Sequence, residues 1–229
     1  MNQIEVAGVR VAYERAGAGP ELVLLHGGFG FDGRSWLRQL DALSDTFTVV
    51  AWDMPGCGRS ADPPETFRAS DFADCLAAFI GALALELYRR QPTIPQSLIL
   101  ASAYAGWAGS LPPEAVEQRK SQALRALALS PEQWARRWSP SMLSASAPAE
   151  LTEEVEASLS TSHPDGQRVI VSAFGDQDVR SPVSVGEDLH ARIPGSQFVV
   201  MPRVGHVSNI EAPERFNAAV RAFLQSLDA

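Results

Sequence analysis

Short apolar runs alternate with helical patterns along this chain of 229 residues. Residues 4–6 and 9–13 flank Ala7-Gly8 and predict an opening hairpin. Leu22–Leu25 is continuously apolar, as a strand buried on both faces requires. Similar apolar runs follow at residues 47–52, 97–101, 169–174 and 197–201. Helical spacing of apolar positions is found at residues 35–43, 71–90 (with Ser70 as the N-cap) and 213–227. This alternation predicts an α/β fold, a doubly wound and mostly parallel sheet.

Residues 106–165 differ from the rest of the chain in composition and in the pattern of apolar residues. Helical stretches that hold Trp134 and Trp138 are followed by an Ala/Ser/Pro-rich stretch at residues 139–149. We therefore expect a core formed by residues 1–105 and 166–229, with residues 106–165 as an inserted helical cap.

The composition of the chain argues against several classes of partner and location. The formal net charge of −8 argues against nucleic acid or an anionic membrane as a partner. The N-terminus has no basic and apolar leader, and the longest apolar run, Leu76–Leu85, is well short of the roughly 18 residues of a membrane helix. Two cysteines are too few for a disulfide framework. We expect a cytoplasmic protein.

A carboxylate and a histidine follow two of the late strands. Asp178 lies four residues beyond Phe174, and His206 lies five beyond Met201, so both are expected at the carboxyl edge of the sheet. A carboxylate beside a histidine can fix its tautomer for acid–base chemistry. The alternative is that Asp176 and Asp178 form an Asx-type turn and that His206 caps the last helix.

The other histidines are expected to serve different purposes. His26, His163 and His190 are predicted to be structural or exposed. None of them has the spacing of a metal site.

A glycine turn follows the strand at residues 22–25. Residues 26–30, His-Gly-Gly-Phe-Gly, allow the backbone to approach a ligand closely. Gly28-x-Gly30-x-x-Gly33 is also a literal dinucleotide fingerprint, and Asp53 lies 20 residues beyond Gly33, where a ribose-binding acid is expected. NAD(P) binding is therefore an alternative.

Together these motifs resemble the α/β-hydrolase superfamily. The matching motifs are the strand and glycine turn at residues 22–28, Asp53-x-Pro55-Gly56-x-Gly58-x-Ser60, Gly175-x-x-Asp178-x-x-Ser181-Pro182, and Gly205-His206 followed by Glu211-Ala212-Pro213-Glu214. The resemblance is nearest to small cofactor-free esterases and enol-lactone hydrolases. These family motifs argue against NAD(P) binding.

The resemblance assigns roles to four residues. It implies that His206 is the base, that Asp178 orients it, and that backbone N–H groups near Gly28 and Phe29 bind an oxyanion. It also implies a small ester- or lactone-like substrate and no cofactor. The sequence carries no signal for an oligomeric state.

The nucleophile of that family is missing from this sequence. It should stand in a Gly-x-Ser-x-Gly elbow between a strand and a helix, and no such motif occurs in the chain. Residues 72–81 resemble the helix before the elbow, and residues 84–92 resemble the end of the helix after it. The sequence therefore predicts a deletion around Gly81–Ala84, and a second one is expected before Val169.

Three other residues are weaker candidates for the nucleophile. Ser102 follows a strand, but Leu100 and Tyr104 stand where a strained elbow needs small residues. Ser60 and Cys57 lie in a glycine loop without a helix N-terminus to activate them. The second hypothesis is accordingly a non-catalytic, degenerate hydrolase-fold binding protein.

Overall fold

The computed structural model of the protein describes residues 2–6, 8–27, 30–79, 97, 99–101, 113–126, 128–161, 163–167, 169 and 183–227. Its strands are β1 (Asn2–Val6), β2 (Val9–Ala16), β3 (Glu21–Leu24) and β4 (Thr48–Trp52). The helices of the first half are η1 (Gly33–Trp36), α1 (Leu37–Leu43) and α2 (Ala69–Phe79). Those of the second half are α5 (Pro113–Ala126), α6 (Pro131–Trp138), η2 (Ser139–Ser141), α7 (Ala149–Leu159), α9 (Val183–Arg192), α10 (Ser208–Glu211) and α11 (Pro213–Gln225).

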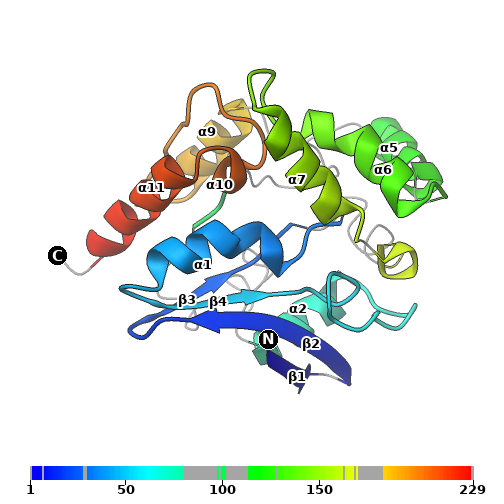
Figure 1. Ribbon diagram of the computed structural model, residues 1–229, viewed down its shortest axis with the longest axis horizontal. Helices are drawn as coiled ribbons and strands as arrows, with labels where there is room; N and C mark the ends of the chain where they lie inside the picture. The colour runs from blue at the N-terminus through cyan, green and yellow to red at the C-terminus, as the bar shows by residue number, and fades with distance from the viewer. Residues whose placement is uncertain are drawn as a thin grey trace.

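The described strands form one mixed sheet in the order β1-β2-β4-β3 (Figure 1). β1 and β2 form the predicted hairpin, and β2 pairs antiparallel with β4. β3 and β4 are parallel, with Leu22 opposite Val49 and Leu24 opposite Ala51. Since β3 and β4 point the same way, the loops that follow them emerge at the same edge of the sheet.

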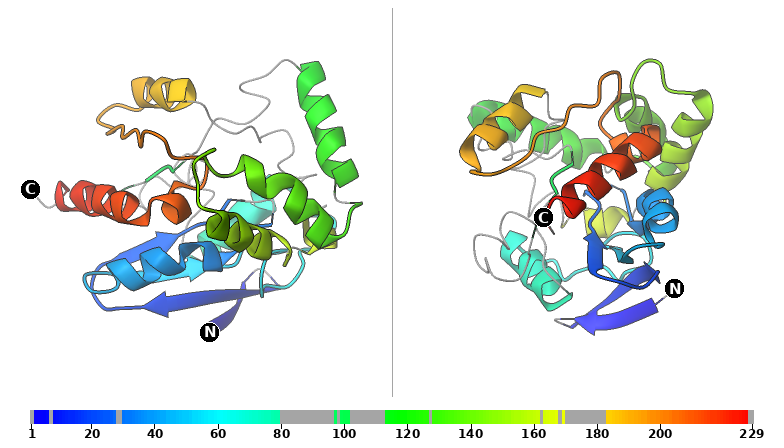
Figure 2. Two further views of the ribbon diagram at one scale, coloured as in Figure 1. Left: turned by 45° about the horizontal axis from the view of Figure 1, so that its top comes forward. Right: turned by 90° about the vertical axis from the view of Figure 1, so that its left-hand side faces the viewer.

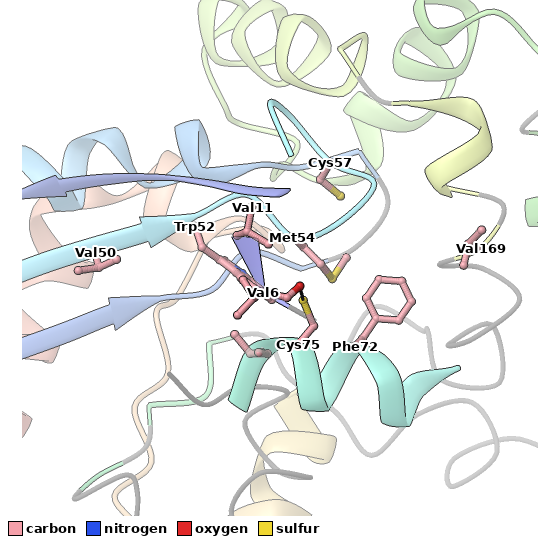
Figure 3. Close-up of a cluster of buried hydrophobic side chains, with 10 residues drawn as sticks. Val6, Val11, Val50, Trp52, Met54, Cys57, Phe72, Cys75 and Val169 are labelled. Atoms are coloured by element: carbon pink, nitrogen blue, oxygen red, sulfur yellow. Dashed lines mark hydrogen bonds between the residues drawn. The ribbon is translucent and has the colours of Figure 1, made fainter. Parts of the chain in front are cut away.

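β4 is buried on both faces because helices cover both sides of the sheet (Figure 1). Val49 and Ala51 share an apolar cluster with side chains of α1 and α11. Val50 and Trp52 point to the other face, where they pack with side chains of α2 such as Phe72 (Figure 3). Successive side chains of β4 thus pack against helices on opposite faces of the sheet, as expected in a doubly wound α/β protein.

A helical segment, residues 113–159, lies to one side of the sheet (Figure 2). Its helix α6 begins with a capping box between Ser130 and Gln133. α6 and α7 bury Trp134, Val155 and Leu159 in a cluster of their own. Within the described part of the chain, no helix has both the length and the apolar character needed to cross a membrane.

Several sequence predictions need correction. Residues 197–201 have no strand conformation, and neither do the described members of 97–101. Val169 is helical, whereas residues 170–174 lie outside the described residues. Ser70 is not an N-cap, because α2 already begins at Ala69. The continuation of that helix to residue 90 also lies outside the described residues.

Candidate active site

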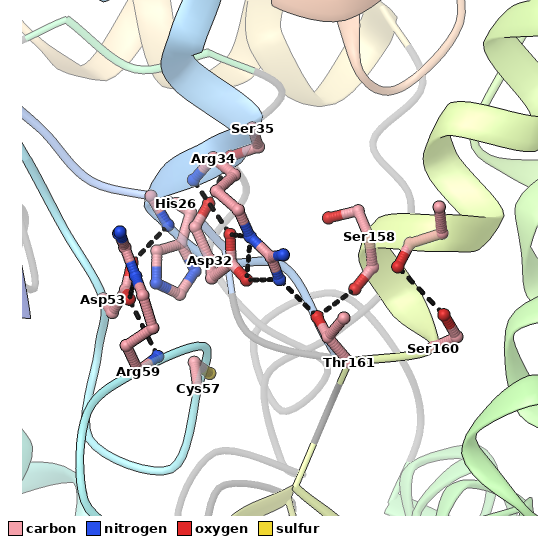
Figure 4. Close-up of polar contacts among 12 residues, drawn as sticks. His26, Asp32, Arg34, Ser35, Asp53, Cys57, Arg59, Ser158, Ser160 and Thr161 are labelled. Carbon is pink, nitrogen blue, oxygen red and sulfur yellow. Dashed lines mark hydrogen bonds and ion pairs between the residues drawn. The ribbon is translucent and has the colours of Figure 1, made fainter. Parts of the chain in front are cut away.

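The loop after β3 begins with His26, a buried residue that joins the ends of two strands (Figure 4). Its Nε2 lies 3.0 Å from the backbone nitrogen of Met54, and a backbone N–H can only donate. Nδ1 therefore carries the proton and donates to the carbonyl of Gly27 at 2.6 Å. Burial lowers the pKa of His26, since desolvation outweighs the hydrogen bond to Gly27. His26 is a neutral structural residue, as expected.

Asp53, at the end of β4, is fully buried and internally bonded (Figure 4). One oxygen accepts the Gly33 N–H at 2.8 Å, and the other accepts the backbone N–H and the Nε–H of Arg59, each at 2.9 Å. Burial raises the pKa of this carboxyl, but the hydrogen bonds from Arg59 and Gly33 outweigh it and the pKa is lowered. A Cβ on residue 33 would lie 2.8 Å from Oδ1 of Asp53, so glycine is required there. The carboxylate that suggested a ribose ligand thus anchors a turn.

Two of the candidate nucleophiles are also engaged in the structure. The Ser60 hydroxyl is buried, donates to the carbonyl of Asp53 at 2.5 Å and accepts the N–H of Ala12 at 2.8 Å. Cys57 is buried, and desolvation raises the pKa of its thiol far above the ordinary value. Because the thiolate is the nucleophilic form, Cys57 is inert in this environment.

The glycine turn contacts the helical segment directly. Gly30 has a φ of 89°, and a Cβ there would approach the Trp134 ring to 2.7 Å. Nearby, Arg34 is paired with the buried Asp32 and donates to the hydroxyl of Thr161 (Figure 4). Trp134 therefore belongs to the apolar cluster that packs on the glycine turn.

His206 is half-buried and lies on a loop that meets the same cluster. Phe31, from the glycine turn, and Val207, next to the histidine, are both buried members of it. Below this loop, Asn209 donates from Nδ2 to the carbonyl of Ser35 at 2.7 Å. These contacts hold the loop of His206 beside the loop that follows β3.

The other predicted site residues lie outside the described residues. They are Gly28, Phe29, Asp178, Ser102 and the junction Gly81–Ala84. Where the chain is described, no group of three or more His, Cys, Asp or Glu side chains could hold a metal ion. The role of Arg59 as the partner of Asp53 was not predicted from the sequence. Glu211 was noted only as part of a motif, although its carboxylate contacts the loop of His206.

A sheet covered by helices on both faces, with loops that leave β3 and β4 at the same edge, defines a doubly wound α/β protein. A sequence model of the alpha/beta hydrolase family matches residues 22–219, and the chain belongs to that family.

Two relatives match the chain over different lengths. A putative carbamate hydrolase of Cronobacter turicensis is 25% identical over 261 aligned positions, which cover 91% of this chain and 92% of the relative. The dihydrolipoyllysine-residue acetyltransferase component of an acetoin cleaving system from Cupriavidus necator is 42% identical over 82 residues. That match covers 36% of this chain and only 22% of that relative.

A solved structure shares the fold over the full length of the chain. The thermophilic esterase from Thermogutta terrifontis has a TM-score of 0.86 and 25% identity. The match covers 100% of this chain and 99% of the esterase. The chain is therefore an α/β hydrolase that resembles esterases.

Proposed function

We propose that this chain retains the acid–base and oxyanion parts of a small ester- or lactone-hydrolase site and lacks its serine nucleophile. In this site His206 is the base, Asp178 orients the imidazole, and the N–H groups of Gly28 and Phe29 bind an oxyanion. A nucleophile beside His206 would lose its proton to the imidazole and attack the carbonyl carbon, while the oxyanion took up the developing charge.

The observation that carries the hydrolase part is the cluster shared by Phe31 and Val207. It brings the loop after β3 and the loop of His206 together, at the edge where such sites are built. Both nitrogens of His26 are occupied by backbone groups, so His26 does not compete for the role of base.

Two observations support the missing nucleophile. The chain contains no Gly-x-Ser-x-Gly. The alignment with the carbamate hydrolase has 261 positions but covers only 91% of the 229 residues of this chain, or about 208 residues, so about 53 positions are occupied in the relative alone. Because Ser60 and Cys57 are buried and engaged, Ser102 is the remaining substitute of the three considered.

The substrate part of the proposal concerns the helical region. We take residues 106–165 as the cap that selects a small ester- or lactone-like molecule, without a cofactor. Trp134 is 4% exposed and contributes to the packing of this region. Trp138, whose ring centroid lies 6.3 Å from that of Trp134, is less buried and is the better candidate for contact with an apolar substrate.

A non-catalytic binding protein is the second candidate function. The missing elbow favours it, because without a nucleophile the remaining groups can bind a carbonyl compound but cannot form an acyl-enzyme. A hydrolase in which a substitute such as Ser102 serves as the nucleophile can form a covalent intermediate, whereas a binding protein cannot.

Intact mass after treatment with a fluorophosphonate separates them. We expect no adduct on folded protein at 24.7 kDa. A stoichiometric adduct that is lost in His206→Ala and kept in Ser60→Ala would prove a serine nucleophile served by His206. Loss of the adduct in Ser102→Ala would then identify that serine, and the proposal that the nucleophile is absent would be wrong.

A further inference from the structure

We infer that Glu211 is a positioning residue for His206, because its carboxylate ties the loop of the histidine to Ser144 in the helical segment. The inference rests on the proposed function, in which His206 is the base. It adds a physical link between the position of the proposed cap and the backbone of that base.

The carboxylate of Glu211 bridges two parts of the chain that are far apart in sequence. Its Oε2 accepts the backbone N–H of Gly205 at 2.9 Å and the backbone N–H of Ser144 at 3.0 Å. Its Oε1 accepts the hydroxyl of Ser144. A single oxygen therefore joins the peptide group before Gly205, the residue that precedes His206, to the helical segment.

The peptide group after His206 is held by the same stretch. The N–H of Val207 donates to the carbonyl of Met142 at 3.2 Å. The peptide groups on either side of the pair Gly205-His206 are thus held against residues 142–144, one directly and one through Glu211. This contact restricts the backbone from which the imidazole leaves the chain.

Close packing at Gly205 leaves little freedom for another arrangement. A Cβ at this position would lie 2.6 Å from both the carbonyl carbon of Leu143 and the nitrogen of Ser144. The two backbones therefore touch, and glycine is the residue that permits the contact.

The charge of Glu211 is suited to this task. Burial raises the pKa of the carboxyl, but the hydrogen bonds from Ser144 and Gly205 outweigh it and hold the pKa below its ordinary value. At neutral pH the group is an anion that accepts all three hydrogen bonds. Hydrogen bonds to a charged acceptor are stronger than those to a neutral one.

The test compares Glu211→Gln with Glu214→Gln. Both substitutions remove one negative charge, but Glu214 is exposed in the first turn of α11. The chain has four histidines, so the imidazole Cε1–H signals can be resolved by NMR and that of His206 assigned from its loss in His206→Gln. Amide exchange at Ser144 and Gly205 and the thermal midpoint are measured on the same samples.

We expect Glu211→Gln to accelerate exchange of the two amides about tenfold or more, because the neutral amide of glutamine is a weaker hydrogen-bond acceptor than the carboxylate. The signal of His206 should move while that of the exposed His190 does not, and Glu214→Gln should change neither. If the amides lose protection but the His206 signal stays in place, Glu211 is only structural and the inference is wrong. If the amides keep their protection, the link itself is wrong.

Ser144→Ala provides the test if Glu211→Gln does not fold. It removes the hydroxyl donor and leaves both backbone donors, so a smaller displacement of the same His206 signal is expected. No displacement would overturn the inference. None of these readings needs catalytic turnover, so a fluorophosphonate adduct can overturn the proposed function without affecting them.

Discussion

Two apolar segments of similar pattern have different structures in this molecule. All five residues of β4 are buried, and the strand lies between β2 and β3. Residues 197–201 have no strand conformation, and Phe198, Val199 and Val200 are 37%, 59% and 49% exposed. β4 obtains its backbone hydrogen bonds from two neighbours, whereas no described strand pairs with residues 197–201. An apolar pattern thus becomes a strand only where a partner strand is available.

We propose that the deletion predicted around Gly81–Ala84 is the reason for this difference. The resemblance places a central strand of the sheet in the segment missing around Gly81–Ala84. Loss of a central strand would take hydrogen-bonding partners from the strands beside it and uncover their apolar side chains. The strands within residues 2–52 pair with one another in a sheet of their own.

The largest effect is expected where β4 ends, at Asp53. Asp53→Asn removes the charge and turns an amide N–H₂ toward the N–H donors of Gly33 or Arg59. Because a buried hydrogen-bonded ion pair is broken, we expect the free energy of unfolding to fall by about 3 kcal/mol. Urea denaturation followed by tryptophan fluorescence measures this change.

An exposed ion pair that attaches the helical segment supplies the control. Glu154, 44% exposed, is bound by both terminal nitrogens of Arg38 at 2.6 Å. Because solvent screens such a pair, Glu154→Gln should cost about 0.5 kcal/mol or less. Equal losses in the two variants would show that the end of β4 is no more rigidly bonded than the surface.

A matched pair of valines tests the comparison of the two segments directly. Val49 is fully buried in β4, and Val199 is mostly exposed. Val49→Ala should lower the free energy of unfolding by about 2 kcal/mol, because two buried methyl groups and their packing are lost. Val199→Ala should change it by about 0.5 kcal/mol or less. A loss of similar size at Val199 would mean that residues 197–201 form a packed strand in solution, against the structure.

Local patterns predicted the elements whose packing partners are present in the structure. The hairpin of β1 and β2, the strands β3 and β4, and the closing helix α11 were all predicted, because each pattern is satisfied by contacts present in the chain. The burial predicted for residues 22–25 was wrong in part, since Leu24 is buried but Leu22 and Val23 are only partly so. The strands expected at residues 97–101 and 197–201 were wrong, since pairing is a property of two segments. α9 was not predicted, as it contains Ser184 and Gly186, which are poor helix formers.

The candidate site divides in the same way. The structural role of His26 agrees with the sequence prediction. The partners of Asp53 could not be predicted, because Arg59 reaches it only through the turn after β4. The roles of Asp178, Gly28 and Phe29 stay predictions. Glu211 was recognised as part of a family motif. Its hydrogen bond to Ser144 could not be predicted, because the two residues are 67 positions apart and meet only in the folded protein.

A further effect is expected at the start of the glycine turn, as a pH dependence. His26 is neutral in the folded state with a pKa below 6.5, its ordinary value in the unfolded chain. As the pH falls below 6.5 the unfolded chain binds a proton that the folded protein does not, so stability is lost toward the lowered folded pKa. The loss can reach about 1.4 kcal/mol per pH unit, the linkage limit for one proton.

Urea denaturation between pH 8 and pH 5 measures this slope before the carboxylates titrate. His26→Asn should be less stable at pH 8, because the Met54 N–H loses its imidazole acceptor, yet its stability should depend less on pH. His190→Gln, which changes an exposed histidine, should keep the slope of the unmodified chain. If His26→Asn kept the full slope instead, another group would bind the proton. The neutral imidazole between β3 and β4 would then not be the origin of the acid sensitivity.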